Sequence, residues 1–440
     1  MRACVDGGGG EVSARARVAE LARFYKDSDS GRRALFLDVL ARDFDVETGE
    51  VVRRFSVFAK ADGELPRAAL LPGLRAALEP PRQSILRQLN RLPDGIKILI
   101  DLRADLMASD PSDPALHALE RELRAMLANW LDVSFLELRR LTWDNPAALL
   151  EKLIRYEAVH EIRGWQDLKN RLDADRRCFA FFHPYMPDEP LAFVEVALVR
   201  GMAGNIQALL DENAPVGDPV GADTAIFYSI SNCQKGLTGI SFGHFLIMRV
   251  VDSLAAELPG LATFATLSPV PSFADWVAAN PDKWASDMLT ARDRRLIAGL
   301  PRALSGFSVG TLLTVPRWWE NEDLARALRG PLMRLCAYYL VSARKGERRR
   351  AADPVAHFHL SNGARIERIN WLADVSPKGL SQSYGLMVNF RYEPSEIEKN
   401  HEAYVGDANV AASGRVRALD ARVHKLAELN ASAAPPNNGS

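Results

Sequence analysis

Cysteine is scarce in this sequence and is not clustered. The four cysteines form no CxxC pair and stand apart from one another, at Cys4, Cys178, Cys233 and Cys336. Structural zinc sites and small disulfide frameworks both need several cysteines at short, regular spacing. We therefore expect neither a metal site nor a disulfide framework, and we expect a reducing compartment.

Long apolar runs and an excess of one charge sign are also missing. No stretch approaches the roughly 20 apolar residues that a membrane-spanning helix needs. The opening MRACVDGGGG lacks the apolar core of a secretory signal, and the chain does not end in a peroxisomal tripeptide. Basic and acidic residues number 55 and 56, so the overall charge favours neither nucleic acid nor an anionic membrane as a partner. We expect a cytoplasmic protein.

The composition is that of a globular protein with more than one domain. The chain has 440 residues, of which 48% are hydrophobic, enough for two or three domains with substantial cores. Residues 1–12 are expected to be disordered. Residues 13–132 carry apolar stripes at helical spacing, such as Val52, Phe55 and Phe58. They predict an all-α helical bundle that serves packing or self-association.

The periodicity changes near Val133, where alternating runs typical of strands begin. The predicted strands are 135–143, 178–183, 191–199, 225–231, 262–267, 357–360, 366–372 and 386–392, with a turn at 187–190. The predicted helices are 146–156, 165–172 and 245–258, together with a helical insertion at 274–345. This alternation predicts a mixed α/β domain over residues 133–430, with helices covering a mixed sheet. The tail at 431–440 is expected to be disordered.

A glycine-bearing turn lies between the predicted strand 225–231 and the predicted helix 245–258. Gly236, Gly239 and Gly243 would let the backbone direct unpaired N–H groups toward one point, next to the positive end of the helix dipole. The natural ligand of such a turn is a phosphate or pyrophosphate. Taken alone the pattern is weak, because glycines also end strands and cap helices in proteins that bind nothing.

Four longer motifs are specific enough to indicate a family: AIFYSIS from Ala225, TLSPVPSF from Thr266, DPVAHFHLSNGA from Asp353 and INWLADVS from Ile369. With the glycine turn, they resemble the malonyl-CoA decarboxylases. The resemblance implies a helical N-terminal domain followed by a catalytic domain with the GNAT-like acyltransferase fold. It also implies conversion of malonyl-CoA to acetyl-CoA and CO2 in fatty acid metabolism, with the coenzyme A thioester as substrate and no further cofactor.

The same resemblance assigns roles to individual residues. The family's catalytic serine, histidine and tyrosine match Ser268, His359 and Tyr392. Its CoA-binding segment matches a run of consecutive residues, Thr238, Gly239, Ile240, Ser241, Phe242, Gly243 and His244. Ser241 stands where the animal members have an acidic residue, so the role of that carboxylate does not carry over.

The implied chemistry needs few groups. Loss of CO2 from a malonyl thioester leaves an enolate that the thioester carbonyl delocalises, so the protein must orient the carboxylate, stabilise the enolate oxygen and supply a proton. The Ser268 hydroxyl suits holding the carboxylate, the His359 imidazole suits donating the proton, and Tyr392 would position either group. His357 would share a strand face with His359, so spacing alone does not choose between them, and the resemblance favours His359.

Two other functions stay open. A GNAT-type acyltransferase would move an acetyl group from acetyl-CoA to an amine, and a non-catalytic sensor would bind malonyl-CoA without turnover. Neither has an evident need for both Ser268 and His359. The basic run at 344–350 is either a contact for the 3′-phosphate of CoA or a solvated surface. The helical domain suggests a homo-oligomer, either a dimer or a tetramer.

Overall fold

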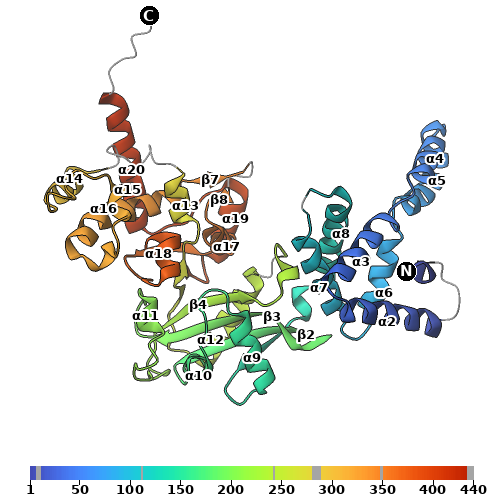
Figure 1. The fold of residues 1–440 in the computed structure, drawn as a ribbon, viewed down its shortest axis with the longest axis horizontal. Helices are drawn as coiled ribbons and strands as arrows, with labels where there is room; N and C mark the ends of the chain where they lie inside the picture. Colours follow the sequence, from blue (N-terminus) through green and yellow to red (C-terminus); the bar gives the residue numbers. More distant parts are fainter. Residues whose placement is uncertain (6–10, 111, 241–242, 280–288, 347–349, 434–440) are drawn as a thin grey trace, which may run out of the picture. The chain divides into compact units, whose positions relative to one another are not determined.

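The computed structural model describes the chain except for residues 6–10, 111, 241–242, 280–288, 347–349 and 434–440 (Figure 1). The chain divides into two compact units. Unit 1 comprises Met1–Arg139, Ala180–Ala192 and Asn232–Phe242. Unit 2 comprises Arg140–Phe179, Phe193–Ser231 and Gly243–Ser440. The units are interleaved in the sequence, since each comprises three segments of the chain.

Unit 1 begins with helices, as predicted. They are α1 (Arg2–Val5), α2 (Glu11–Asp27), α3 (Ser30–Arg42), α4 (Thr48–Lys60), α5 (Glu64–Ala77), α6 (Arg82–Asn90), α7 (Gly95–Ala108) and α8 (Pro114–Trp130). Helix α7 is largely apolar and buried, and it packs against α3, α6 and α8. A helix that is apolar on most of its surface is stable only inside a core, so α7 forms the centre of this bundle.

Two details of these helices differ from the sequence-based expectations. Residues 2–5 form α1 although disorder was expected there, because Cys4 is buried and its carbonyl oxygen accepts a hydrogen bond from Gln88 Nε2. The predicted apolar stripe of α4 stays outside the core, since Val52 and Phe55 are each 58% exposed. Helices α4 and α5 pack against each other. Helical spacing therefore identified an apolar face of α4 correctly but not what covers it.

The main sheet has eight strands among the described residues, in the order β1-β2-β3-β4-β5-β10-β6, with β9 pairing to β10. Their bounds are β1 (Glu137–Leu141), β2 (Arg176–His183), β3 (Met186–Val199), β4 (Thr224–Asn232), β5 (Thr263–Thr266), β6 (Ser268–Pro269), β9 (Arg365–Asn370) and β10 (Met387–Tyr392). Strand β4 is parallel to β5, and β10 is antiparallel to β5, β6 and β9. The sheet is therefore mixed, as predicted. The turn expected at 187–190 lies instead at Pro184–Tyr185, and β3 starts directly after it.

Most of the remaining described elements are helices and short 3₁₀ helices. The first group is α9 (Ala147–Tyr156), α10 (Trp165–Arg171), α11 (Ile206–Leu209), η2 (Lys235–Leu237), α12 (Gly243–Glu257), α13 (Phe273–Ala278), α14 (Ala291–Ala298) and α15 (Val309–Leu313). The second group is η5 (Trp318–Glu320), α16 (Glu322–Val341), the hairpin β7 (Arg344–Lys345) and β8 (Arg350–Ala351), α17 (Pro354–Ser361), α18 (Pro377–Ser383), α19 (Ile397–Asp407) and α20 (Gly414–Ala433). The chain thus combines a helical N-terminal part with a mixed α+β part, which confirms the predicted fold class.

One predicted strand is wrong. Residues 357–360 belong to helix α17, whose N-cap is Asp353 and whose first residue is Pro354. The Asp353 carboxylate accepts hydrogen bonds from the backbone N–H groups of Val355 and Ala356, both at 2.9 Å. An aspartate followed by proline is a strong start signal for a helix, and it outweighs the strand propensity of a short apolar run. Gly363, with φ +80°, follows the C-cap Asn362 and ends this helix.

Candidate active site

Ser268 lies at the beginning of β6, where this two-residue strand pairs with Val388 of β10. Its side chain is buried, with 6% of the residue exposed. The Ser268 Oγ donates a hydrogen bond to Thr266 Oγ1 at 2.8 Å and lies 3.0 Å from Nε2 of His359. The Thr266 Oγ1 also accepts a hydrogen bond from the Phe390 backbone N–H at 3.1 Å. The serine hydroxyl is therefore held between a fixed threonine and an imidazole.

His359 reaches this point from helix α17. The residue is 3% exposed, and its Nδ1 lies 2.8 Å from the hydroxyl oxygen of Tyr392 in β10. Its ring stacks on Phe390, with 4.6 Å between the ring centroids. The three residues that the resemblance marked as catalytic are thus in one hydrogen-bonded row, Tyr392 to His359 to Ser268.

The charge state of this row follows from its burial. Burial lowers the pKa of His359 to about 3 and raises the pKa of Tyr392 well above its ordinary value. At neutral pH the imidazole and the phenol are both uncharged. A consistent set of protons has Tyr392 O–H donating to Nδ1, the Nε2–H donating to Ser268 Oγ, and Ser268 O–H donating to Thr266. Such a row can pass a proton toward Ser268 without a buried charge at rest.

The position of His359 depends on Asp353. This aspartate caps helix α17, and its Oδ2 also accepts a hydrogen bond of 3.4 Å from the backbone N–H of Ser272, which follows the Ser268 strand. One buried carboxylate therefore joins the segment that carries the serine to the helix that carries the histidine. Burial raises the pKa of Asp353 to about 6, and the hydrogen bonds from Ala356, Ser272 and Val355 lower it in part.

The helix also separates the two histidines that the sequence left undecided. Successive helical residues are rotated by about 100°, so His357 and His359 point in widely different directions. The His357 Nδ1 lies 2.8 Å from the hydroxyl of Tyr404 in α19, whereas His359 contacts Ser268 and Tyr392. The expectation that both share one face was wrong because the segment is helical.

The glycine turn is only partly described. Ser241 and Phe242 lie outside the described residues, and Gly243 and His244 begin α12 in unit 2. Thr238, Gly239 and Ile240 belong to unit 1, so the structure does not bring them together with Ser268 and His359 in one unit. The backbone N–H groups of Thr238 and Ile240 donate to carbonyl oxygens of Lys235 and Leu237 within the turn. These two N–H groups are not the free donors that the sequence predicted.

Two of the glycines have structural explanations. A Cβ atom on Gly236 would lie 1.9 Å from the carbonyl oxygen of Ile100 in α7, so only glycine fits there. Gly239 has φ +77°, which favours glycine, and its carbonyl oxygen accepts a hydrogen bond of 2.6 Å from Arg124. Beside it, a cavity of about 670 Å³ is lined by Gly239, Ile240, Arg121 and Arg124, among others. The two arginines come from α8, and sequence reasoning missed them because α8 is more than 100 residues away in the chain.

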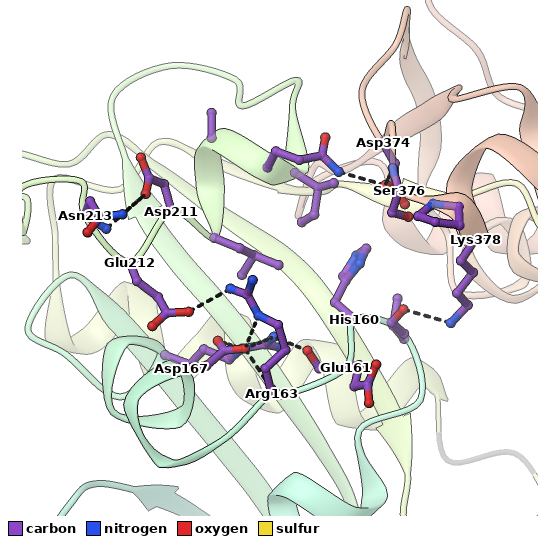
Figure 2. Close-up of a pocket in the computed structure, with 17 residues that line it drawn as sticks. His160, Glu161, Arg163, Asp167, Asp211, Glu212, Asn213, Asp374, Ser376 and Lys378 are labelled. Carbon is purple, nitrogen blue, oxygen red and sulfur yellow. Dashed lines mark hydrogen bonds and ion pairs between the residues drawn. The ribbon is translucent and has the colours of Figure 1, made fainter. Parts of the chain in front are cut away.

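Figure 2 shows a cavity of unit 2 with a volume of about 1060 Å³. Some of its charged side chains pair with one another, as in Arg163 with Glu212 at 2.7 Å and Arg171 with Asp167 at 2.8 Å. Burial lowers the pKa of His160, which is labelled in the centre of the view, to about 4. Ser268, His359 and Tyr392 do not line this cavity. Its lining holds five acidic and three basic side chains and is separate from the buried row of serine, histidine and tyrosine.

The fold and the buried row of serine, histidine and tyrosine define an enzyme with a helical N-terminal part and a mixed α+β catalytic part. Residues 134–433 match the family described as "Malonyl-CoA decarboxylase C-terminal domain", and residues 44–131 match "Malonyl-CoA decarboxylase N-terminal domain". The chain belongs to the malonyl-CoA decarboxylase family. Among the described residues, none of the helices is long and apolar enough to cross a membrane.

Individual relatives support this assignment over most of the chain. The mitochondrial malonyl-CoA decarboxylase of the goose Anser anser anser is 37% identical over 435 residues, which cover 94% of this chain and 85% of that protein. The rat enzyme is 36% identical over 434 residues, 94% of this chain and 87% of that protein. The crystal structure of malonyl-CoA decarboxylase from Rhodopseudomonas palustris is 40% identical, with a TM-score of 0.84 over 94% of this chain and 98% of that one. The corresponding structure from Agrobacterium vitis has a TM-score of 0.83 at 40% identity, covering 95% and 98%.

Proposed function

We propose that this protein is a carboxy-lyase that converts malonyl-CoA to acetyl-CoA and CO2, and that Ser268, His359 and Tyr392 carry out the reaction. The observation that carries the proposal is the 3.0 Å distance between Ser268 Oγ and His359 Nε2 in a buried site of a chain that belongs to this family. The site contains a hydroxyl to hold a carboxylate and an imidazole to supply a proton. These are the two groups that decarboxylation of a thioester requires.

Ser268 orients the substrate. The C–C bond to the carboxylate breaks most easily when it stands perpendicular to the thioester plane, because its electron pair then flows into the carbonyl system. A hydrogen bond from the Ser268 hydroxyl to the carboxylate fixes that orientation. To make this bond, the Ser268 hydroxyl turns from Thr266 Oγ1, its acceptor in the unliganded site, to the substrate. The bond electrons pass to the thioester oxygen as an enolate while CO2 leaves as a neutral molecule.

His359 returns a proton to the enolate carbon. Its imidazole is neutral in the unliganded site, since burial lowers its pKa to about 3. A malonyl carboxylate next to Ser268 places a negative charge close to Nε2, which raises the pKa of His359 and favours uptake of one proton with the substrate. After CO2 has left, the Nε2–H proton passes to the carbon, and the new C–H bond gives the methyl group of acetyl-CoA. Malonyl-CoA plus one proton thus gives acetyl-CoA plus CO2.

The CoA part of the substrate is assigned to the segment Thr238–His244. Helix α12 begins at Gly243, so the dipole of this helix favours an anion at the end of the segment. Arg121 and Arg124, which line the cavity beside Gly239, would add positive charge for the phosphates. The basic hairpin at Arg344, Lys345 and Arg350 remains a further candidate for the 3′-phosphate. We also propose that the sheet has the GNAT-like fold, which the parallel pairing of β4 and β5 supports.

The proposal includes no further cofactor, because the thioester carbonyl itself accepts the electrons that the departing CO2 leaves behind. It also includes a cytoplasmic location and a homo-oligomer. The four cysteines are buried and are not joined in disulfides, which suits a reducing compartment, although the goose and rat relatives are named as mitochondrial. Val52 and Phe55 form an exposed apolar face on α4, which is the kind of surface that a second copy covers.

The test is a mass-spectrometric assay of the purified protein with malonyl-CoA in the presence of EDTA. We expect acetyl-CoA and CO2 in equal amounts, unaffected by the chelator. Binding of intact malonyl-CoA without turnover would contradict the enzyme and favour a sensor. Formation of an acetylated amine from acetyl-CoA in a parallel screen of acceptors, without decarboxylation, would favour the acyltransferase.

A further inference from the structure

Seven arginines gather around one cleft of unit 2, which we call the arginine cleft. It has a volume of about 1030 Å³ and is lined mainly by α14, α16, β9 and α20. Helix α16 packs against both α14 and α20, and the three helices are labelled in Figure 1. The arginines come from all four elements: Arg292, Arg326, Arg329, Arg334, Arg368, Arg415 and Arg422. The cleft is therefore a built concave site rather than a charged run along one helix.

The fold supplies little negative charge to this cleft. Among the described residues, Asp293 is the one acidic residue of the lining, and it pairs with Arg334 at 2.5 Å. Arg326 at the rim pairs with Asp323 at 3.3 Å. In the described part of the chain, no carboxylate pairs with the exposed residues Arg292, Arg329, Arg415 and Arg422.

Neighbouring carboxylates are engaged elsewhere. Glu367 of β9 pairs with Arg365 at 2.7 Å, and Asp420 of α20 accepts a hydrogen bond of 2.8 Å from Ser342 Oγ. Burial and then the nearby charge of Arg415 lower the pKa of Arg368, and Glu367 raises it in part. Uncompensated positive charges at close range raise the free energy of the folded state. A bound anion would remove that cost.

The cleft also has an apolar and aromatic side. Trp371 lines it together with Met333, and the Trp371 ring packs against Trp318 with 5.9 Å between the centroids. That contact holds a half-buried indole at the cleft. Arginine guanidinium groups bind phosphate oxygens through charge-assisted hydrogen bonds, and an aromatic face stacks on a nucleobase. The volume is close to the upper end of the range of about 300–1,000 Å³ for small-molecule pockets.

We propose that the arginine cleft is a second ligand site that binds a nucleotide polyphosphate, with the phosphates among the arginines and the base on Trp371. The ligand is either a free nucleotide or the 3′-phosphorylated ADP end of a coenzyme A molecule, which present the same chemistry. The site lies wholly in unit 2, and no residue of the segment Thr238–His244 lines it.

A buried hydrogen-bond path leads from the cleft toward Ser268. The side chains of Arg368 and Asn370, which line the cleft, donate to Asn389 Oδ1 at 3.1 and 2.8 Å. Asn389 Nδ2 in turn donates to the Thr266 carbonyl oxygen at 2.7 Å, and Thr266 Oγ1 holds the Ser268 hydroxyl. Asn389 is fully buried, and its Nδ2 also donates to the Ala203 carbonyl oxygen at 2.9 Å. The amide nitrogen and oxygen each make two hydrogen bonds, so the path is rigid. A ligand that repositions Arg368 would therefore alter the orientation of Ser268.

The binding test is isothermal titration calorimetry of the full chain with ATP at low and moderate ionic strength. The test variant carries Arg329→Gln and Arg415→Gln, and the matched control is Arg295→Gln, an exposed arginine of α14 outside the cleft lining. We expect wild type and control to bind ATP with the same Kd, with weaker binding as salt rises. The double variant should show a Kd raised roughly ten-fold or more, as expected for lost charged hydrogen bonds.

Three results would overturn the proposal. Unchanged ATP binding in the double variant would place the nucleotide elsewhere. Equally tight binding of inorganic tripolyphosphate and ATP, together with no effect of Trp371→Leu on ATP binding, would show that the nucleoside contributes nothing. The cleft would then be a simple anion site. A change of molecular mass of the double variant in light scattering, without ATP binding by the wild type, would make the cleft an interface between protein chains.

The source of the nucleotide is resolved by repeating the titration with the protein saturated by acetyl-CoA. Displacement of ATP, with a raised KM for malonyl-CoA in the double variant, assigns the cleft to the ADP end of CoA. Binding of ATP alongside acetyl-CoA, with an unchanged KM, assigns it to a free nucleotide. Both outcomes support the shared chemistry.

The path to Ser268 has a separate readout, which rests on the proposed decarboxylase function. If free ATP occupies the cleft, saturating ATP should change kcat for malonyl-CoA in the wild type and in Arg295→Gln but not in the double variant. A kcat that ATP leaves unchanged at proven occupancy would rule out the link to Ser268. A protein that binds ATP but does not turn over malonyl-CoA would instead refute the decarboxylase function, and calorimetry distinguishes the two failures.

Discussion

The Oγ atom of Ser268 lies 3.0 Å from Nε2 of His359, although 91 residues separate them in the sequence. The serine comes from a two-residue strand that pairs with β10 at Val388. The histidine comes from a short helix and contacts Tyr392 and Phe390 of the same strand. Strand β10 pairs with β6 and places its aromatic residues against the imidazole. The site thus depends on three separate segments that meet at one central strand, and each segment gives a testable prediction.

Tyr392→Phe should lower kcat about ten-fold and leave KM unchanged. The substitution keeps the ring but removes the hydroxyl that lies 2.8 Å from Nδ1 of His359, so the imidazole loses the bond that fixes its tautomer. Steady-state kinetics measures both parameters. Tyr404→Phe is the matched control, because its hydroxyl contacts His357 instead. Equal losses in the two variants would show that the effect is a general one of lost tyrosine hydroxyls.

Asp353→Ala should destabilise the protein by about 0.5–2 kcal/mol, the usual cost of losing a helix N-cap. The variant removes the acceptor for the backbone N–H groups of Val355 and Ala356 in α17 and of Ser272, which follows the Ser268 strand. Asp353→Asn keeps an acceptor oxygen and should lose less. Urea denaturation measures the difference, and exposed Asp323→Ala serves as the control. Stability unchanged in Asp353→Ala would contradict the role of this carboxylate in holding α17.

The buried neutral state of His359 predicts an acid-sensitive fold. Its folded-state pKa is about 3, below the ordinary value of roughly 6.5. Between these pH values the unfolded chain binds a proton that the folded chain does not, so the free energy of unfolding falls as pH falls from about 6.5. The contribution is at most roughly 1.4 kcal/mol for each pH unit.

Comparing His359→Gln with wild type isolates this effect from other titrating groups. Urea denaturation between pH 7 and pH 4.5 should show a shallower fall for the variant than for the wild type. His117→Gln, at an exposed position of α8, should retain the wild-type slope. Parallel curves for His359→Gln and wild type would mean that the imidazole is already protonated or exposed in the folded state.

Gly236→Ala should impair folding rather than ligand binding alone. A Cβ atom at this position would lie 1.9 Å from the Ile100 carbonyl oxygen, and backbone atoms of α7 cannot move aside cheaply. We expect a loss of stability of roughly 1–3 kcal/mol, typical of overpacking. Thermal denaturation measures it, with Gly49→Ala, which has open space around it, as the control. A stable Gly236→Ala protein with weakened CoA binding would restore the ligand-binding explanation of this glycine.

Helices and strands could largely be predicted from the sequence where a periodic apolar pattern extended over many residues or where a motif was specific. The helices of residues 13–132 and the strands β2, β3, β4 and β10 follow from apolar spacing alone. The segment 357–360 failed because four apolar and aromatic residues fit a strand or a helix equally well, and the deciding signal was Asp353–Pro354 just upstream. Local cap chemistry should therefore be weighed before short-range alternation.

Some of the candidate functional residues could be found from the sequence, and others could not. Ser268, His359 and Tyr392 were found through the resemblance, whereas their arrangement in one row needed the pairing of β6 with β10. The arginine cleft could not be predicted, because its arginines are spread from 292 to 422 over four separate elements. The basic run at 344–350 was conspicuous in the sequence but forms only part of a hairpin.

The central claim is that Ser268 and His359 act on bound malonyl-CoA. The direct measurement determines kcat for malonyl-CoA and Kd for acetyl-CoA in the wild type, Ser268→Ala and His359→Gln. The control variant is Thr263→Val, at the first residue of β5. The account predicts that kcat falls by roughly 100-fold or more in the first two variants, with Kd close to the wild-type value, and that the control is unchanged. Turnover near the wild-type rate in either variant would contradict it.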